Sequence, residues 1–127
     1  MNNGNNEYTE EAKARWGHTE AYKESTRRTS NYSKEDFAKA AADQERAIDL
    51  FITAMDANLD INSEQVKLAV VAHRKAISDW FYECSEEMQV GLAEMYIADP
   101  RFTQFYESRR TGLAQFVHDG ILASARG

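Results

Sequence analysis

Helical spacing of large apolar residues along most of the chain is the feature that most constrains the fold. The longest stripe runs from Val66 to Cys84, and apart from the adjacent Trp80 and Phe81 its members are three or four residues apart: Val66, Val70, His73, Ile77, Trp80, Phe81 and Cys84. Such spacing places the side chains on one face of an α-helix. No segment alternates convincingly with the period of two typical of half-buried strands. With only 6 glycines and 1 proline, the sequence predicts an all-α fold.

Cap residues and breakers divide this pattern into helices. The expected caps are Thr19, Ser33 with Asp36 as a variant of the reciprocal capping box, Ser63 and Asp99. The helix that follows Ser33 is expected to bury a face that includes Phe37 and Phe51. Two short amphipathic segments are expected near the N-terminus, and longer ones follow: 8–17, 19–28, 33–57, 63–84, 86–99, a segment opened by Pro100 and a last helix after Gly112. Isolated helices shorter than ~12–15 residues are marginal in water, so the first two need something to pack on. We therefore expect residues 1–30 to form a flexible N-terminal region and residues 31–127 a helical core, together making one domain.

The composition excludes several functional classes. A net charge of −6 opposes attraction to phosphate backbones, so this chain is not expected to bind nucleic acid. Its single cysteine and the polar start "MNNGNNEYTEEAK" indicate neither a disulfide framework nor a signal peptide, and we expect a cytoplasmic protein. No apolar run approaches the ~18 residues that a membrane span needs.

Residues that could carry chemistry are sparse. The three histidines, His18, His73 and His118, are far apart and lack the spacing of a helical metal site. No Gly-rich phosphate loop and no positioned acid–base pair is found, so we expect no catalytic residues, no metal and no cofactor. His73 is interpreted either as a satisfied core histidine or as a polar group that orients a ligand in an apolar pocket. Cys84 is either a small buried residue or a nucleophile at a pocket rim.

Aromatic residues offer a surface for binding. The consecutive Trp80, Phe81 and Tyr82 cannot all face one core if they are helical, because successive residues point about 100° apart. We predict that Trp80 forms the inner wall and that Tyr82 faces the opposite surface. Large aromatic residues on a second surface indicate a binding site.

Three stretches carry a resemblance to a known family. "EAKARWGHTEAYKES", "HRKAISDWFYECSEEMQVGLAEMYIADPRF" and "GLAQFVHDGILA", in this order, closely resemble the TipAS antibiotic-recognition domain, the C-terminal half of MerR-family regulators that respond to thiopeptides. The resemblance runs from about Glu11 to the C-terminus. It implies a globin-like helical fold without haem, with a cleft for large, mostly apolar, multi-ring antibiotics. It also implies a mobile N-terminal lid that closes over the ligand.

Full-length regulators of this family carry a winged helix-turn-helix and a dimerising coiled coil, and the sequence contains neither. We therefore expect either an effector-sensing domain, dimerising through a separate regulator half, or a stand-alone drug-sequestering protein. The alternative is a protein-interaction or dimerisation domain whose aromatic surface packs on another chain. The predicted ligand-binding residues are Trp16, Tyr22, His73, Trp80, Tyr82, Tyr96 and Phe102. Some family members capture thiopeptides through a cysteine; either Cys84 is that residue, or Gly91 takes the position and binding is noncovalent.

Overall fold

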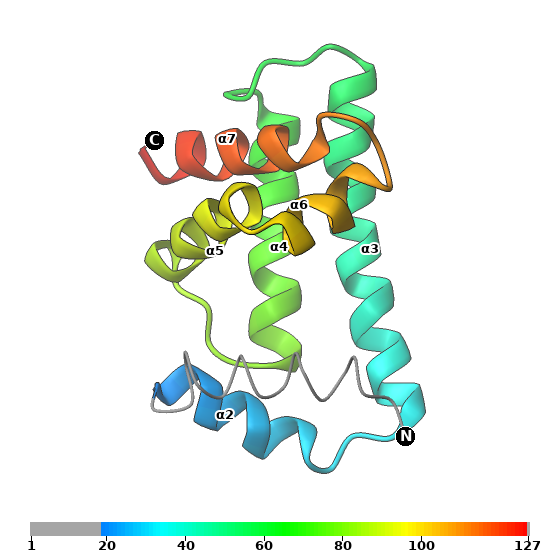
Figure 1. Cartoon of the computed structure of the whole chain (residues 1–127), viewed down its shortest axis with the longest axis vertical. Coiled ribbons are helices and arrows are strands. Elements are labelled where there is room, and N and C mark those ends of the chain that lie inside the picture. The colour runs from blue at the N-terminus through cyan, green and yellow to red at the C-terminus, as the bar shows by residue number, and fades with distance from the viewer. Residues whose placement is uncertain (1–18, 127) are drawn as a thin grey trace.

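Six helices and no strand make up the part of the chain that the structure, a computed structural model, describes, residues 19–126. Their bounds are α2 Glu20–Thr29, α3 Lys34–Asp56, α4 Glu64–Trp80, α5 Glu86–Ala98, α6 Pro100–Glu107 and α7 Leu113–Arg126. The long helices α3 and α4 lie side by side, α5, α6 and α7 lie across them, and α2 lies at the other end (Figure 1). The predicted all-α class is confirmed.

The helices begin where the cap residues predict. Ser33 and Asp36 form the expected reciprocal capping box at the start of α3. Thr19, Ser63 and Asp99 each accept a hydrogen bond from a backbone N–H in the first turn of the next helix. These bonds satisfy N–H groups that a helix start leaves unpaired, which is why short polar side chains are favoured there.

Helix α4 ends earlier than the sequence predicts. It stops at Trp80 instead of continuing to Cys84, and Phe81 leaves helical geometry at φ −122° and ψ −61°. Two bonds close the end: the Phe81 N–H donates to the Ile77 carbonyl at 2.9 Å, and the Cys84 N–H donates to Ser78 Oγ at 3.0 Å. A side chain thus replaces the next turn of helix. The sequence does not predict the end of α4 at Trp80, because the helical spacing of apolar residues continues through residues 81–84.

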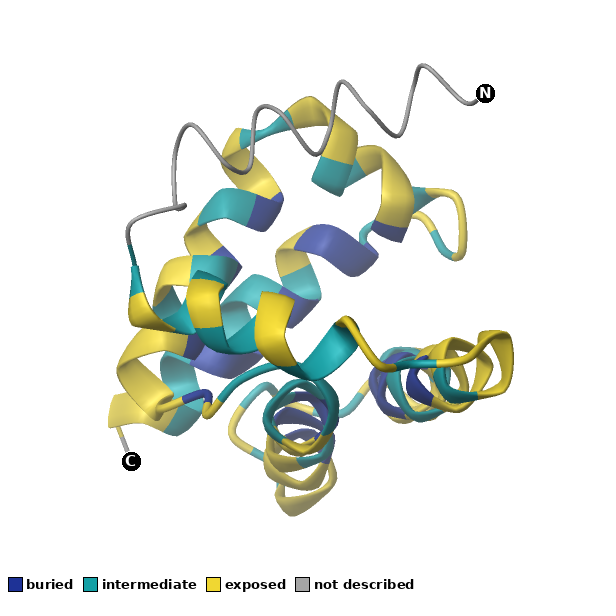
Figure 2. Cartoon of the chain, turned by 90° about the horizontal axis from the view of Figure 1, so that it is seen from below, coloured by how far each residue is buried: buried dark blue, intermediate teal, exposed yellow. Residues whose placement is uncertain are grey.

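The core lies where α3, α4 and α7 meet, with α5 and α6 covering one side. Figure 2 shows the buried segments on the inward faces of these helices. Helix α7 approaches closely, since a Cβ on Gly120 would lie 2.9 Å from Val66 Cγ1 and 3.4 Å from Phe51 Cε1. The core cluster is Ile48, Phe51, Ala54, Val66, Ala69, Val70, Ala93, Tyr96, Tyr106, Leu113, Ala114, Val117 and Ile121.

The first turns of α3 project beyond this core. Its buried positions are Ala40 and four residues further on, from Ala47 to Ala54. Phe37, which the sequence places on the buried face, is 46% exposed. The prediction for Phe37 is wrong because the α5–α7 layer covers only the C-terminal half of α3 (Figure 1).

Helix α2 is held on the end of α4 by polar contacts. The Arg28 guanidinium donates to the Ser78 carbonyl at 2.7 Å and also pairs with Glu24 on its own helix. None of the residues of α2 is fully buried. The first of the two predicted short helices, 8–17, lies outside the described residues.

Among residues 19–126, no helix is both long enough and apolar enough to cross a membrane.

Candidate ligand pocket

A pocket of about 280 Å³ lies between α3 and the corner that joins α5 to α6. We call it the corner pocket. The corner is fixed by Asp99, which accepts the Arg101 N–H at 3.0 Å and pairs with its guanidinium at 2.8 Å. Pro100 occupies the first turn of α6, where its missing N–H costs nothing. The corner pocket is lined by Gln44, Tyr96, Arg101, Phe102, Phe105 and Tyr106.

Aromatic rings form most of the wall. Tyr96 is central, with ring centroids 4.8 Å from Tyr106 and 6.0 Å from Phe102. Phe105 packs edge-on against Tyr106 at 5.1 Å and remains 36% exposed. The Arg109 guanidinium lies 4.0 Å from the Phe105 ring centroid. A mostly apolar wall with a few polar groups is how small-molecule sites are commonly built.

A second hollow lies between α3 and α4. This outer groove, of about 370 Å³, is lined by Asp43, Arg46, Ala47, Leu50, Ala72, Lys75, Ala76 and Asp79. The outer groove is larger than the corner pocket, but Leu50 is the only large apolar side chain among the described residues of its lining. Its charged side chains form the ion pairs Asp43–Arg46 and Lys75–Asp79. The corner pocket has the better chemistry for a ring-rich ligand.

His73 lies in the core behind the pocket. It is 2% exposed, and both ring nitrogens have partners: Nδ1 lies 2.8 Å from Gln89 Nε2, and Nε2 lies 3.2 Å from the Tyr96 hydroxyl. Burial, with a smaller effect of Arg74, lowers the pKa of His73 to about 4. The geometry therefore favours the satisfied core histidine over direct ligand contact.

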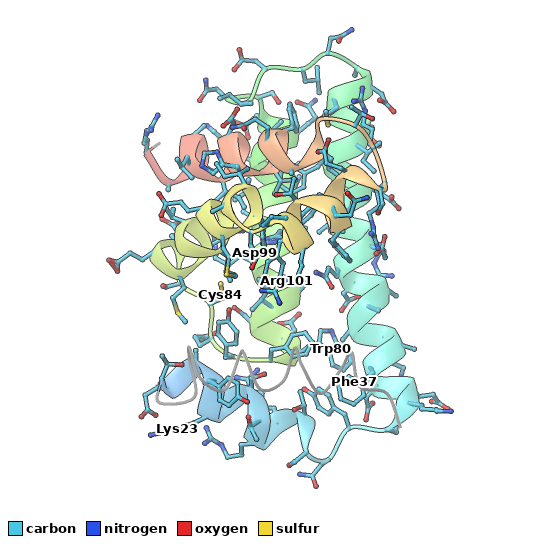
Figure 3. The ribbon with its side chains drawn as sticks, viewed as in Figure 1. Lys23, Phe37, Trp80, Cys84, Asp99 and Arg101 are labelled. Atoms are coloured by element: carbon cyan, nitrogen blue, oxygen red, sulfur yellow. The ribbon has the colours of Figure 1, made fainter. Side chains whose placement is uncertain are left out.

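Trp80 does not form the inner wall of the core, and that prediction is wrong. Its indole N–H donates to Asp43 Oδ2 at 2.6 Å, and its ring lies edge-on to Tyr32 at 5.8 Å. Tyr32 in turn packs on Phe37 at 5.5 Å and donates its hydroxyl to the Trp80 carbonyl at 2.6 Å. Tyr32, Phe37 and Trp80 form an aromatic group, the Trp80 cluster, near α2; Figure 3 shows Phe37 and Trp80 there.

Tyr82 and Cys84 belong to the segment between α4 and α5. Because α4 ends at Trp80, the prediction that Tyr82 and Trp80 occupy opposite faces of one helix is wrong. Burial raises the pKa of Tyr82 to about 12 and also raises the pKa of the Cys84 thiol. A raised pKa leaves less thiolate at neutral pH, so the environment does not activate Cys84 for covalent capture. Gly91, the alternative position, is exposed on α5.

Only two of the predicted ligand-binding residues, Tyr96 and Phe102, line the corner pocket. Tyr22 lies on α2, and Trp16 lies outside the described residues. Gln44 and Arg101 also line the pocket but were not predicted. Helical spacing gives no signal for them, because polar residues are usual on a solvated helix face. Phe105 and Tyr106 could have been found from the aromatic run that follows the Asp99–Pro100 corner.

An aromatic pocket with a few polar groups in an all-helical domain is typical of ligand-binding proteins. Within residues 19–126, no group of His, Cys, Asp and Glu could hold a metal ion. The sequence matches the TipAS antibiotic-recognition domain over residues 8–124. The chain belongs to this family, whose description is one of recognition and not of catalysis.

Similar proteins agree with this assignment. The HTH-type transcriptional activator TipA of Streptomyces coelicolor is 38% identical over 119 residues, covering 94% of this chain and 47% of the relative, and TipA of Streptomyces lividans gives the same values. The HTH-type transcriptional activator mta of Bacillus subtilis is 30% identical over 115 residues, 91% of this chain and 44% of the relative. The chain thus spans about half the length of these relatives.

A solved structure also resembles this one over most of the chain. It is described as nosiheptide in complex with TipAS, from a thiopeptide antibiotic multidrug resistance system of Streptomyces lividans. The TM-score is 0.88 at 37% sequence identity, covering 95% of this chain and 85% of the other. At this identity the likeness extends beyond the fold class to the arrangement of the helices.

Proposed function

We propose that this protein binds large, mostly apolar, multi-ring antibiotics of the thiopeptide class, with the corner pocket as the centre of the site. The observation that carries the proposal is the similarity to TipAS, whose solved structure is described as a complex with nosiheptide. The aromatic wall around Tyr96 supports it, because stacked and edge-on rings are favourable partners for heteroaromatic ligands.

The pocket alone is small for such a ligand. Drug-sized sites commonly enclose ~300–1,000 Å³, against about 280 Å³ here. We propose that the ligand also covers surface beside the pocket and that residues 1–30 close over it as a mobile lid. Trp16, Tyr22, Trp80 and Tyr82 would then complete the site from the α2 end. Such closure costs ordering free energy, which makes the segment suitable as a switch. We also retain the globin-like arrangement as the finer description of the fold.

The relatives supply the biological setting that we propose. They are transcriptional activators about twice as long as this chain, so the domain would act as the effector-sensing part of a MerR-type regulator or as a drug-sequestering protein. Its net charge of −6 opposes DNA contact by this chain. DNA contact and dimerisation would then belong to a separate regulator half. Noncovalent binding fits the buried Cys84 better than covalent capture.

A specific observation keeps a second candidate open. Leu50, Leu68 and Val71 are 44%, 62% and 46% exposed on α3 and α4. Exposed apolar side chains of this size favour contact with another chain when they gather on one surface. The second candidate is therefore a protein-interaction or dimerisation domain.

Titration with nosiheptide, followed by tryptophan fluorescence and calorimetry, tests the first candidate. We expect saturable binding in the low micromolar range or tighter. Phe105→Ala should weaken it by about 5-fold or more, because one exposed aromatic contact is typically worth ~1 kcal/mol. Leu50→Ala is the matched control, since Leu50 is 44% exposed against 36% for Phe105 and lines the outer groove.

Two results would count against the proposal. Absence of a nosiheptide response, together with concentration-dependent self-association, would favour the second candidate. Equal weakening by Phe105→Ala and Leu50→Ala would place the ligand somewhere other than the corner pocket.

A further inference from the structure

Arg109, which follows shortly after the end of α6, links that helix to α3 beside the corner pocket. Its Nε donates to Glu45 Oε1 at 3.1 Å, and its Nη2 donates to Glu45 Oε2. Its Nη1 donates to the Phe105 carbonyl at 2.9 Å, and its guanidinium carbon lies 4.0 Å from the Phe105 ring centroid. One planar group therefore contacts a carboxylate of α3, the last turn of α6 and an aromatic ring of the pocket wall.

The Phe105 ring depends on such a contact to keep one orientation. Its side chain is partly exposed, and Tyr106 packs edge-on against it at 5.1 Å. A partly exposed side chain can exchange rotamers, and it loses this freedom when a ligand stacks on it. A ring that is already held in place before binding avoids this loss, which is the usual gain from preorganisation.

The contact with Glu45 fixes the guanidinium relative to α3. A guanidinium that donates two parallel hydrogen bonds to one carboxylate is held in both position and orientation. Glu45 directly follows Gln44, which lines the corner pocket from α3, whereas Phe105 lines it from α6. Glu45 and Arg109 are not part of the lining themselves. The pair thus connects two helices of the pocket from a position beside it.

We propose that Arg109 is a positioning residue of the corner pocket. Anchored on Glu45, it holds the Phe105 ring in the orientation in which an aromatic ring of the ligand stacks on it. The inference rests on the proposed function and adds the residue that prepares one wall of that site. Because a partly exposed ion pair contributes little to stability, loss of Arg109 should reduce ligand affinity and hardly change the free energy of unfolding.

The next residue along the chain provides a matched control. Arg110 Nε donates to Asp56 Oδ1, at the end of α3, at 2.9 Å, so this arginine also links α3 to the segment after α6. Both ion pairs are partly exposed. The Nη1 of Arg110 donates to the Thr111 carbonyl at 2.7 Å, whereas that of Arg109 donates to Phe105. A general effect of removing an α3 ion pair should therefore appear in both arginines.

The position of the guanidinium can be measured by NMR without a ligand. The ring current of an aromatic ring shifts protons above its face upfield, so the Hδ protons of Arg109 should resonate upfield of those of Arg110. Phe105→Leu should abolish this difference, and Glu45→Ala should reduce it, because the guanidinium then loses its anchor. Asp56→Ala is the control and should leave it unchanged. Equal Hδ shifts in the two arginines, or a difference that Glu45→Ala does not alter, would overturn the inference.

A double-mutant cycle with nosiheptide tests the consequence for binding. Arg109→Ala should weaken binding about 3-fold, the cost typical of restricting one side chain, while the urea midpoint of unfolding changes little. In the Phe105→Ala background, Arg109→Ala should have no further effect, because the ring through which it acts is absent. Arg110→Ala should leave the affinity unchanged.

The outcomes separate this inference from the proposed function. If the wild type does not bind nosiheptide, the proposed function fails and the ligand part of the inference fails with it. If the wild type binds and Arg109→Ala binds equally well, the inference alone is wrong. A loss of affinity that persists in the Phe105→Ala background would assign Arg109 to direct ligand contact or to folding, and would also contradict the positioning role.

Discussion

Mild acid should destabilise this protein through His73 in particular. The pKa of His73 is about 4 in the folded protein, lowered from 6.5 mainly by burial. The unfolded chain therefore binds a proton at this position more readily than the folded one does. Stability linked to His73 is fully present above pH 6.5 and is lost as the pH falls towards 4.

The size of the pKa shift of His73 determines how much stability is lost in acid. A difference of about 2.5 pKa units corresponds to about 3 kcal/mol in total, at 1.36 kcal/mol per unit. Between pH 7 and pH 5, where His73 titrates in the unfolded but not in the folded state, about 2 kcal/mol of unfolding free energy should be lost. Staying above pH 5 limits the contribution of carboxylates.

Urea denaturation at pH 7 and pH 5, for the wild type and His73→Gln, measures this loss. His73→Gln should be less stable than the wild type at pH 7, because it disturbs a buried hydrogen-bond network. Between pH 7 and pH 5, however, its free energy of unfolding should fall by about 2 kcal/mol less than that of the wild type. His118→Gln, at a histidine paired with Asp119 on α7, is the control and should keep the wild-type loss. If the wild type and His73→Gln lose the same unfolding free energy between pH 7 and pH 5, the conclusion that His73 is buried and neutral is refuted.

The remaining predictions concern packing and a helix cap. Gly120→Ala should lower the unfolding free energy by about 1–2 kcal/mol, since its Cβ would lie 2.9 Å from Val66 Cγ1 and overpacking outweighs the gain in helix propensity. Gly91→Ala, with nothing within 4 Å of the added Cβ, should instead raise it by about 0.5–1 kcal/mol; urea midpoints that move the same way would contradict this account. Asp99→Ala should cost about 1 kcal/mol through loss of the α6 cap, and an unchanged thermal midpoint would be evidence against that role.

Much of the fold could be predicted because its signals are local. Ser33, Ser63 and Asp99 cap the helices as expected, since a cap needs only a short polar side chain at a helix start. The end of α4 could not be predicted, because a bond from the Cys84 backbone to Ser78 replaces the next turn. The hydrophobic periodicity of the sequence does not indicate such a hydrogen bond between a side chain and the backbone.

The candidate site was harder to predict, because it depends on which helices meet. Tyr96 and Phe102 are among the residues predicted to bind ligand, and both line the corner pocket. Trp80 is also among them but packs on Tyr32 near α2. Helical periodicity identifies the buried face of a helix and does not say which neighbour covers it, so Gln44 of α3 could not be placed beside α6 from the sequence.

The structure of the protein with nosiheptide bound tests the central claim most directly. We expect the antibiotic to contact Tyr96, Phe102 and Phe105 in the corner pocket. An antibiotic seated in the outer groove against Leu50, with the corner pocket empty, would contradict it.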